Sequence, residues 1–176
     1  MISIKQLIPQ YFKEIKNINS VIDLGCGKSK KSSYFFKQGI KVIGVDKKPS
    51  QIKNPNFKFV HKNIKDFEFN KKYDLIMANF ILHFFKKQEA INIIKKIQEN
   101  TNHKGYNFLI CMSNQDECMK EHEDNFYPTI NELKSFYPEN KWKIIKSIQD
   151  FTDYEEHGNM LKHRHNIIII LFKKFK

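Results

Sequence analysis

Short apolar runs recur along the chain and are separated by longer stretches with helical periodicity. The run at residues 75–78 is apolar throughout, which is typical of a strand that is buried on both faces. Residues 167–170 are all isoleucine, so we expect the last strand to lie inside the sheet and not at its edge. The apolar runs predict seven strands, at residues 21–24, 42–45, 57–60, 75–78, 106–111, 142–148 and 164–172.

Helical patterns fill several of the intervals between these strands. Residues 87–100 carry apolar side chains at helical spacing. Residues 32–37 are also predicted to form a helix, which Gly39 can cap at its C-terminus. Thr129 and Glu132 form a capping box that opens a helix. Strands that alternate with helices and finish in a hairpin predict an α/β fold with a doubly wound, Rossmann-like sheet of seven strands. We expect a mostly parallel sheet with an antiparallel C-terminal hairpin, and one domain over residues 1–176.

The first 20 residues have helix-like apolar spacing that Pro9 interrupts. One interpretation is a short helix packed on the edge of the sheet. The other is a lid over a cofactor, in which Tyr11 and Phe12 shield the reacting group. Both can hold together.

The net charge of +12 would suit a nucleic-acid partner, but the basic residues are scattered. Scattered lysines predict weak, salt-sensitive RNA binding with Kd of about 10⁻⁴ to 10⁻⁶ M. Three cysteines without a C-x-x-C pair indicate a reduced, cytoplasmic setting. The longest aliphatic run is far shorter than the roughly 20 residues of a membrane span, so we expect no membrane partner.

The candidate chemistry begins at Gly25 and Gly27, which follow the first predicted strand and precede a helix. A ligand can approach the backbone closely where no Cβ intervenes. Asp46, at the tip of the second strand, is placed to accept both hydroxyls of a ribose. Lys30 occupies the sixth position of the dinucleotide fingerprint and breaks it. The pattern therefore predicts a nucleoside cofactor other than a nicotinamide dinucleotide.

The pattern Asp23-x-Gly25-x-Gly27, with Asp46 later, resembles the first two motifs of the class I S-adenosylmethionine (SAM)-dependent methyltransferases. Ser29 stands where that family usually has a third glycine. Asn63 stands where the family usually has an Asp that accepts from the adenine amino group, although a loop asparagine without that role is equally compatible. The resemblance implies SAM as cofactor, with Asp23 near its amino-acid end. It implies cofactor contacts at Asp23, Gly25, Cys26, Gly27, Asp46, Lys47, Asn63, Ile64, Asn79 and Phe80.

Residues 73–85 resemble the fourth motif of the same superfamily, in which the end of the strand borders the transferable methyl group. Asn79 and Phe80 occupy that end. His83 follows and is a candidate base, but a histidine there can equally pack or contact the cofactor.

Residues 132–137, Trp142 and residues 158–164 resemble the C-terminal region of the tellurite-resistance-type methyltransferases. This resemblance implies a small-molecule acceptor that is a soft nucleophile, such as a tellurium or selenium oxyanion or a thiol. It also implies roles for His157 and Arg164, which we predict to be catalytic together with His83. Arginine can grip an oxyanion in two places, but a salt bridge from Arg164 to Glu155 or Glu156 is an alternative.

Two other functions remain open at this stage. A methyltransferase for RNA or protein would explain the positive charge, and a SAM-binding module without catalysis would share the same motifs. Glu155, His157, His163 and His165 lie close in sequence and allow a metal site, but we expect none because no chelating turn is evident.

Overall fold

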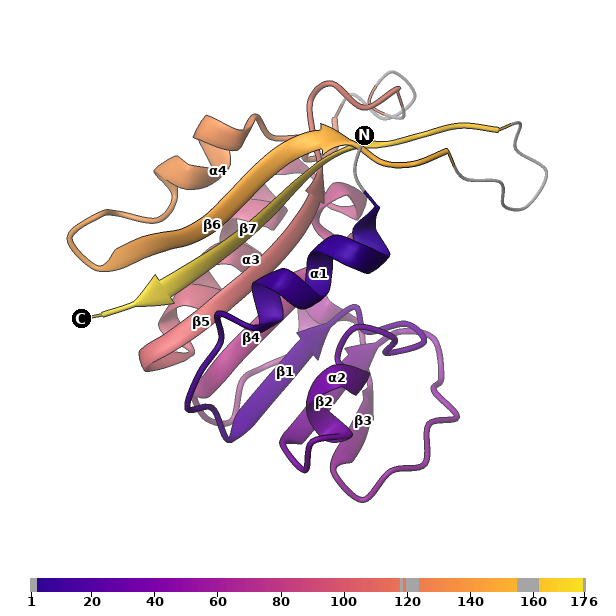
Figure 1. Ribbon diagram of the computed structural model, residues 1–176, viewed down its shortest axis with the longest axis vertical. Coiled ribbons are helices and arrows are strands. Elements are labelled where there is room, and N and C mark those ends of the chain that lie inside the picture. The colour runs from indigo at the N-terminus through magenta and orange to yellow at the C-terminus, as the bar shows by residue number, and fades with distance from the viewer. Residues whose placement is uncertain (1–2, 118, 120–123, 155–161, 176) are drawn as a thin grey trace.

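Seven strands form one sheet in the order β3-β2-β1-β4-β5-β7-β6 (Figure 1). The computed structural model describes residues 3–117, 119, 124–154 and 162–175. The strands are β1 (Ser20–Leu24), β2 (Lys41–Asp46), β3 (Phe57–His61), β4 (Tyr73–Asn79), β5 (Thr101–Met112), β6 (Trp142–Phe151) and β7 (Asn166–Lys174).

The pairing of the strands confirms the predicted architecture. Strands β1 to β5 pair in parallel, whereas β7 runs antiparallel to both β5 and β6. The isoleucine run lies in β7, between β5 and β6. Ile168 and Ile170 join the hydrophobic core on one face, and Ile167 and Ile169 join the core on the other. A strand covered on both faces is apolar at every position, which is why this run predicted an interior strand.

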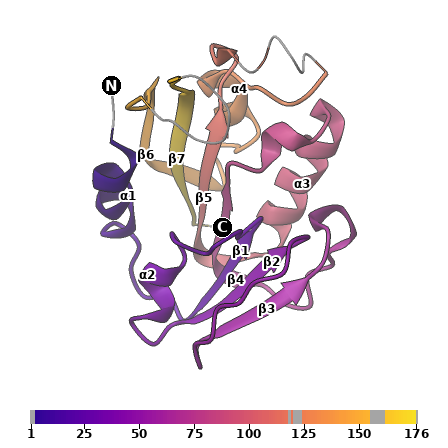
Figure 2. The ribbon, with the colours of Figure 1, turned by 90° about the vertical axis from the view of Figure 1, so that its right-hand side faces the viewer.

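Helices cover both faces of the sheet. α1 (Ile4–Phe12) and α2 (Ser33–Phe36) pack on one face, and α3 (Lys87–Glu99) and α4 (Ile130–Ser135) on the other (Figure 2). The short 3₁₀ helices η1 (Ile64–Asp66) and η2 (Leu82–Phe84) follow β3 and β4. At the start of α4, the Thr129 hydroxyl accepts a hydrogen bond from the Glu132 backbone N–H at 3.0 Å, as the capping box predicted.

The predicted position of the N-terminal helix is wrong. α1 lies across the face of the sheet and not at its edge (Figure 1). The Tyr11 hydroxyl donates to the Ile169 carbonyl at 3.3 Å, and the rings of Phe12 and Phe108 are 5.2 Å apart. Both predicted shielding residues, Tyr11 and Phe12, are therefore buried in the core. Among the residues that the structure describes, no helix is long and apolar enough to cross a membrane.

Candidate functional site

The carboxyl ends of β1 and β4 form the centre of the candidate site. The chain leaves β1 toward β2 and β3 and then returns to β4 on the other side of β1, so the strand order reverses between these two strands. Ligands of open α/β sheets bind in the crevice at such a reversal. The parallel register of β1 and β4 places Asp23 beside Met77. The glycine turn and Asn79 therefore reach the same edge of the sheet.

The glycine turn has a backbone that requires glycine. Gly25 and Gly27 have φ of 69° and 50°, in the left-handed region. The Gly25 and Cys26 N–H groups both donate to the Val45 carbonyl, at 2.8 and 3.1 Å, which ties the turn to β2. A Cβ on Gly25 would lie 2.7 Å from Ile81, whereas a Cβ on Gly27 would meet nothing within 4 Å. Open space therefore lies beside Gly27.

Asp46 is fixed at the tip of β2 by two backbone donors. Its Oδ2 accepts from the Gly27 N–H at 2.8 Å, and its Oδ1 accepts from the Lys48 N–H at 2.8 Å. Each carboxylate oxygen has a further lone pair for a ligand. The acid thus lies beside the open space at Gly27, and its contact with a ribose stays a prediction.

Asp23 is a buried carboxyl group at the end of β1. Burial raises its pKa to about 6, although the nearby Ser32, Lys31 and Asn79 side chains lower it in part. Among the described residues, Asp23 Oδ1 and both amide atoms of Asn79 lack a hydrogen-bond partner. Buried polar atoms without partners are costly. A ligand cation that donates hydrogen bonds would satisfy the two oxygens, whereas the Asn79 amide nitrogen needs an acceptor.

Four other predicted residues already make contacts within the protein. The Cys26 side chain is buried and packs toward Gly44, and burial raises the pKa of its thiol to about 12. The Asn63 Oδ1 accepts from the Lys65 N–H at 3.1 Å and so caps η1. Its adenine contact stays a prediction that depends on a second lone pair. The Lys47 carbonyl lies 2.9 Å from His61 Nε2, while Ile64 is buried in the core.

A cavity of about 880 Å³ lies where β4, β5 and β6 end. Phe80 and His83 line it, as do Lys30 and Lys31, which follow the glycine turn. Phe80 has φ of 54°, and the Lys31 ammonium is 5.1 Å from the centre of its ring. A non-glycine residue in this conformation is uncommon and typical of functional sites. The other lining residues are Ser3, Ile4, Lys5, Phe84, Met112, Thr152, Asp153, Tyr154 and His165.

The Arg164 side chain lies against two aromatic rings, and its catalytic role stays a prediction. Its guanidinium lies 4.2 Å from the centre of the Phe151 ring and 5.5 Å from that of Tyr154. Arg164 is not among the residues that line the cavity, whereas the next residue, His165, is. Successive side chains of an extended chain point to opposite sides, which explains why His165 lines the cavity and Arg164 does not. His157, Glu155 and Glu156 lie outside the described residues.

One pair of residues beside the cavity was not predicted as a pair from the sequence. The His165 Nδ1 lies 3.1 Å from the buried carboxylate Oδ2 of Asp116. Asp116 follows β5, 49 residues earlier in the chain, so no local spacing connects the two. From the sequence, His165 was considered only as one member of a possible metal site with the nearby histidines. In the parts of the chain that the structure describes, no three metal-ligating side chains gather.

Solved structures of methyltransferases share this fold. The crystal structure of TehB from Haemophilus influenzae aligns with a TM-score of 0.76 at 22% identity, covering 95% of this chain and 61% of that one. The N-methyltransferase NodS from Bradyrhizobium japonicum WM9, solved with S-adenosyl-L-homocysteine, aligns with a TM-score of 0.71 at 8% identity, covering 98% of this chain and 87% of that one. The fold is therefore the Rossmann-like fold of these enzymes.

The sequence identifies the family within this fold. The family model described as "Tellurite resistance protein TehB" matches residues 8–169, and the chain belongs to this family. A probable S-adenosyl-L-methionine-dependent methyltransferase TehB from Haemophilus influenzae (strain 10810) is 27% identical over 154 residues. That alignment covers 81% of this chain and 53% of the relative. The chain thus spans about half the length of the curated relatives that it matches most fully.

Proposed function

We propose that this protein is a SAM-dependent methyltransferase that methylates a small-molecule acceptor. The buried Asp23, which faces Asn79 at the reversal of the strand order, carries the proposal. The name of the Haemophilus relative and the bound S-adenosyl-L-homocysteine in the NodS structure support the choice of cofactor. We expect the acceptor to be a soft nucleophile, such as a tellurium or selenium oxyanion or a thiol.

We expect SAM to bind where β1, β2 and β4 end. Asp23, with Asn79, would hold the cationic amino group of the methionine part, and Asp46 would accept from the ribose hydroxyls. The open space at Gly27 allows the cofactor to lie against the backbone. When bound, SAM supplies an electrophilic methyl group on a positively charged sulfur. Phe80, at the end of β4, would border that group and keep water from it.

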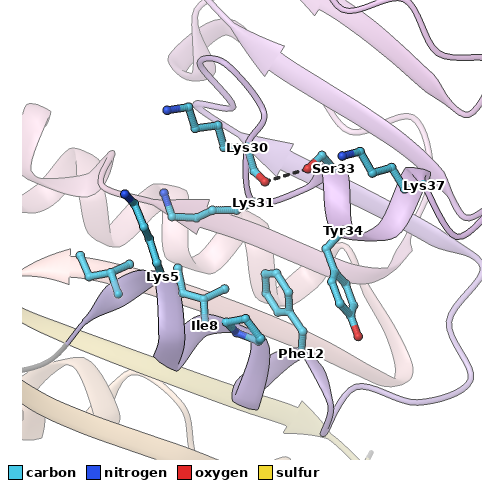
Figure 3. Close-up of a pocket in the computed structure, with 10 residues that line it drawn as sticks. Lys5, Ile8, Phe12, Lys30, Lys31, Ser33, Tyr34 and Lys37 are labelled. Atoms are coloured by element: carbon cyan, nitrogen blue, oxygen red, sulfur yellow. Dashed lines mark hydrogen bonds between the residues drawn. The ribbon is translucent and has the colours of Figure 1, made fainter.

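The site also has room for an acceptor with negative charge. A second pocket of about 480 Å³ lies between α1 and α2, with Ile8 and Phe12 among its apolar residues. Lys5, Lys30 and Lys31 line both this pocket and the larger cavity. Figure 3 shows the smaller pocket, with the side chains of these three lysines on the same side of it. Positive charge at the mouth of a site attracts and orients anions. This arrangement favours an anionic or ionisable small acceptor.

Replacement of Asp46 by alanine tests the cofactor assignment. The substitution removes a charge-assisted acceptor for the ribose, and we expect SAM affinity to fall by roughly 2–4 kcal/mol. Titration calorimetry with SAM and S-adenosylhomocysteine measures the change. Glu14→Ala removes an exposed carboxylate at the end of α1 and serves as the control. Unchanged affinity in Asp46→Ala would refute the assignment.

Transfer of a radioactive methyl group from SAM to a panel of acceptors tests the reaction. The panel contains selenite, tellurite, small thiols, small amines and bulk tRNA. Transfer to one of the small molecules supports the proposal. Binding of SAM without transfer to any of them would favour a non-catalytic module instead.

RNA binding by this protein should be weak and unselective. We expect Kd values of about 10⁻⁴ to 10⁻⁶ M near physiological salt, because lysines spread over a surface bind phosphates without reading bases. Fluorescence anisotropy with two RNAs of different sequence, at two salt concentrations, measures this. A nanomolar complex that depends on sequence would promote the RNA methyltransferase alternative.

A further inference from the structure

His165 is a cavity residue that a buried carboxylate holds in place. His165 is 8% exposed and lines the 880 Å³ cavity together with Phe80. Its Nδ1 lies 3.1 Å from Asp116 Oδ2, and the Asp116 side chain is entirely buried. The proposed cofactor site does not use either residue.

The backbone around the pair is fixed on both sides. The Asn166 N–H donates to the same Asp116 oxygen at 2.8 Å, which stabilises the carboxylate in its ionised form. The His165 N–H donates to the Thr152 hydroxyl at 3.0 Å, and the Thr152 N–H donates to the His165 carbonyl at 2.8 Å. An ionised Asp116 accepts only, so the His165 Nδ1 carries the proton. The lone pair of the neutral imidazole is then at Nε2.

We propose that His165 is the general base of the methyl transfer, that Asp116 is its positioning residue, and that among the soft nucleophiles named above the acceptor is a thiol. This inference rests on the proposed function. An oxyanion of selenium or tellurium offers a lone pair without losing a proton, so it needs no base. A neutral thiol must lose its proton as it reacts, and a histidine beside the reaction site can take it.

The step balances in atoms and charge. His165 Nε2 takes the S–H proton while the electron pair of that sulfur forms the new bond to the methyl carbon. The pair of the broken methyl–sulfonium bond returns to the departing sulfur. A methyl thioether, neutral S-adenosylhomocysteine and an imidazolium result. Asp116 then stabilises the imidazolium until it passes its proton to water, as the buried aspartate does in a Ser-His-Asp triad.

Other charged groups face the cavity and affect its pH dependence. His163 lies beside His165, with ring centres 5.0 Å apart. The remaining titratable groups of the cavity come from α1, the glycine turn, η2 and the end of β6, and they are Lys5, Lys30, Lys31, His83, Asp153 and Tyr154. A base of the proposed kind predicts that activity falls as pH decreases, and that removal of His165 abolishes this fall.

The tautomer of His165 tests the inference before any turnover is measured. Nitrogen-15 NMR of histidine-labelled protein, without cofactor, should show that the His165 ring carries its proton on Nδ1 and none on Nε2 at neutral pH. Asp116→Asn removes the acceptor charge and should weaken this preference. A His165 ring with its proton on Nε2 would overturn the inference, because that nitrogen would not be basic.

Kinetics with 2-mercaptoethanol as acceptor test the role directly. We expect His165→Gln to lower kcat about 10²- to 10⁴-fold and to lose the acidic limb of the pH profile. Asp116→Asn should lower kcat less and shift that limb to lower pH. His103→Gln, which changes an exposed histidine on β5, is the control. Calorimetry with SAM on every variant separates chemistry from binding.

The outcomes distinguish this inference from the proposed function. If the wild type binds SAM but methylates selenite and no thiol, or if His165→Gln keeps the wild-type pH profile, the inference fails while the proposed function stands. If the wild type does not bind SAM, the proposed function fails, and with it the inference. If His165→Gln does not fold, the NMR tautomer and the Asp116→Asn profile decide.

Discussion

Replacing Asp23 with asparagine should stabilise the unliganded protein and at the same time weaken its binding of SAM by about a hundredfold or more. Burial raises the pKa of this carboxyl group to about 6 from the ordinary 3.8. The folded state therefore holds the proton more tightly than the unfolded state does. The contribution of Asp23 to the stability of the fold is highest below pH 4. It decreases as pH rises through about 6 and stays reduced above that. Asparagine carries no charge and avoids this cost at every pH.

The raised pKa of Asp23 also sets the expected size of the gain in stability. Each pKa unit corresponds to about 1.4 kcal/mol, so we expect Asp23→Asn to gain about 1–3 kcal/mol at pH 7.5. For a chain of this length that is a rise of several degrees in Tm, at about 2–4 °C per kcal/mol. Loss of the partner of a buried ammonium should weaken SAM binding by about 3 kcal/mol or more, at least a hundredfold. Thermal melts and calorimetry on the same preparations measure both effects.

Asp74 provides a matched control at the other end of the neighbouring strand. Burial raises its pKa, but hydrogen bonds from the Asn19 and Ser20 backbones and from the Ser20 and Asn102 side chains outweigh burial and lower it. Asp74→Asn should therefore lose about 1–3 kcal/mol of stability and keep its SAM affinity. If Asp23→Asn instead lost stability in the same way, Asp23 would be a structural residue and not a ligand-binding one.

Much of the fold was readable from local sequence because strands buried on both faces leave an unmistakable pattern. The isoleucines of β7 and residues 75–78 of β4 are examples. Boundaries were less predictable: β5 begins at Thr101, five residues before its apolar core, and β6 continues to Phe151. These extensions depend on pairing with neighbouring strands and not on hydrophobicity. The position of α1 also depends on tertiary contacts, since its amphipathic pattern fits an edge and a face equally.

Site residues that are close in sequence were predictable, and those that are far apart in sequence were not. Gly25, Gly27 and Asp46 lie within 22 residues of one another, and the structure brings them together as their spacing predicted. Asp116 and His165 could not be connected, because the antiparallel β7 brings them together from distant parts of the chain. Arg164 was predicted from the resemblance to the tellurite-resistance-type methyltransferases. His165 lines the cavity and Arg164 does not, because successive residues of an extended chain point to opposite sides.

Alanine substitutions at the two glycines of the turn should separate stability from cofactor binding. Gly25→Ala places a Cβ 2.7 Å from the Ile81 side chain in a left-handed backbone, at φ of 69°. Strain and overpacking together should cost about 2–4 kcal/mol of stability. Gly27→Ala has a left-handed backbone too, at φ of 50°, but its Cβ meets no protein atom within 4 Å. We expect it to cost only about 1 kcal/mol from strain.

The effect on affinity should run in the opposite order. The Cβ of Gly27→Ala enters the open space that we assign to the cofactor, so SAM affinity should fall about tenfold or more, by at least 1.4 kcal/mol. Gly39→Ala is the control, because Gly39 has φ of 84°, equally open surroundings and a place beyond the end of α2. It should lose as much stability as Gly27→Ala and none of the affinity. Equal SAM affinities of Gly27→Ala and Gly39→Ala would show that the open space beside the glycine turn does not hold the cofactor.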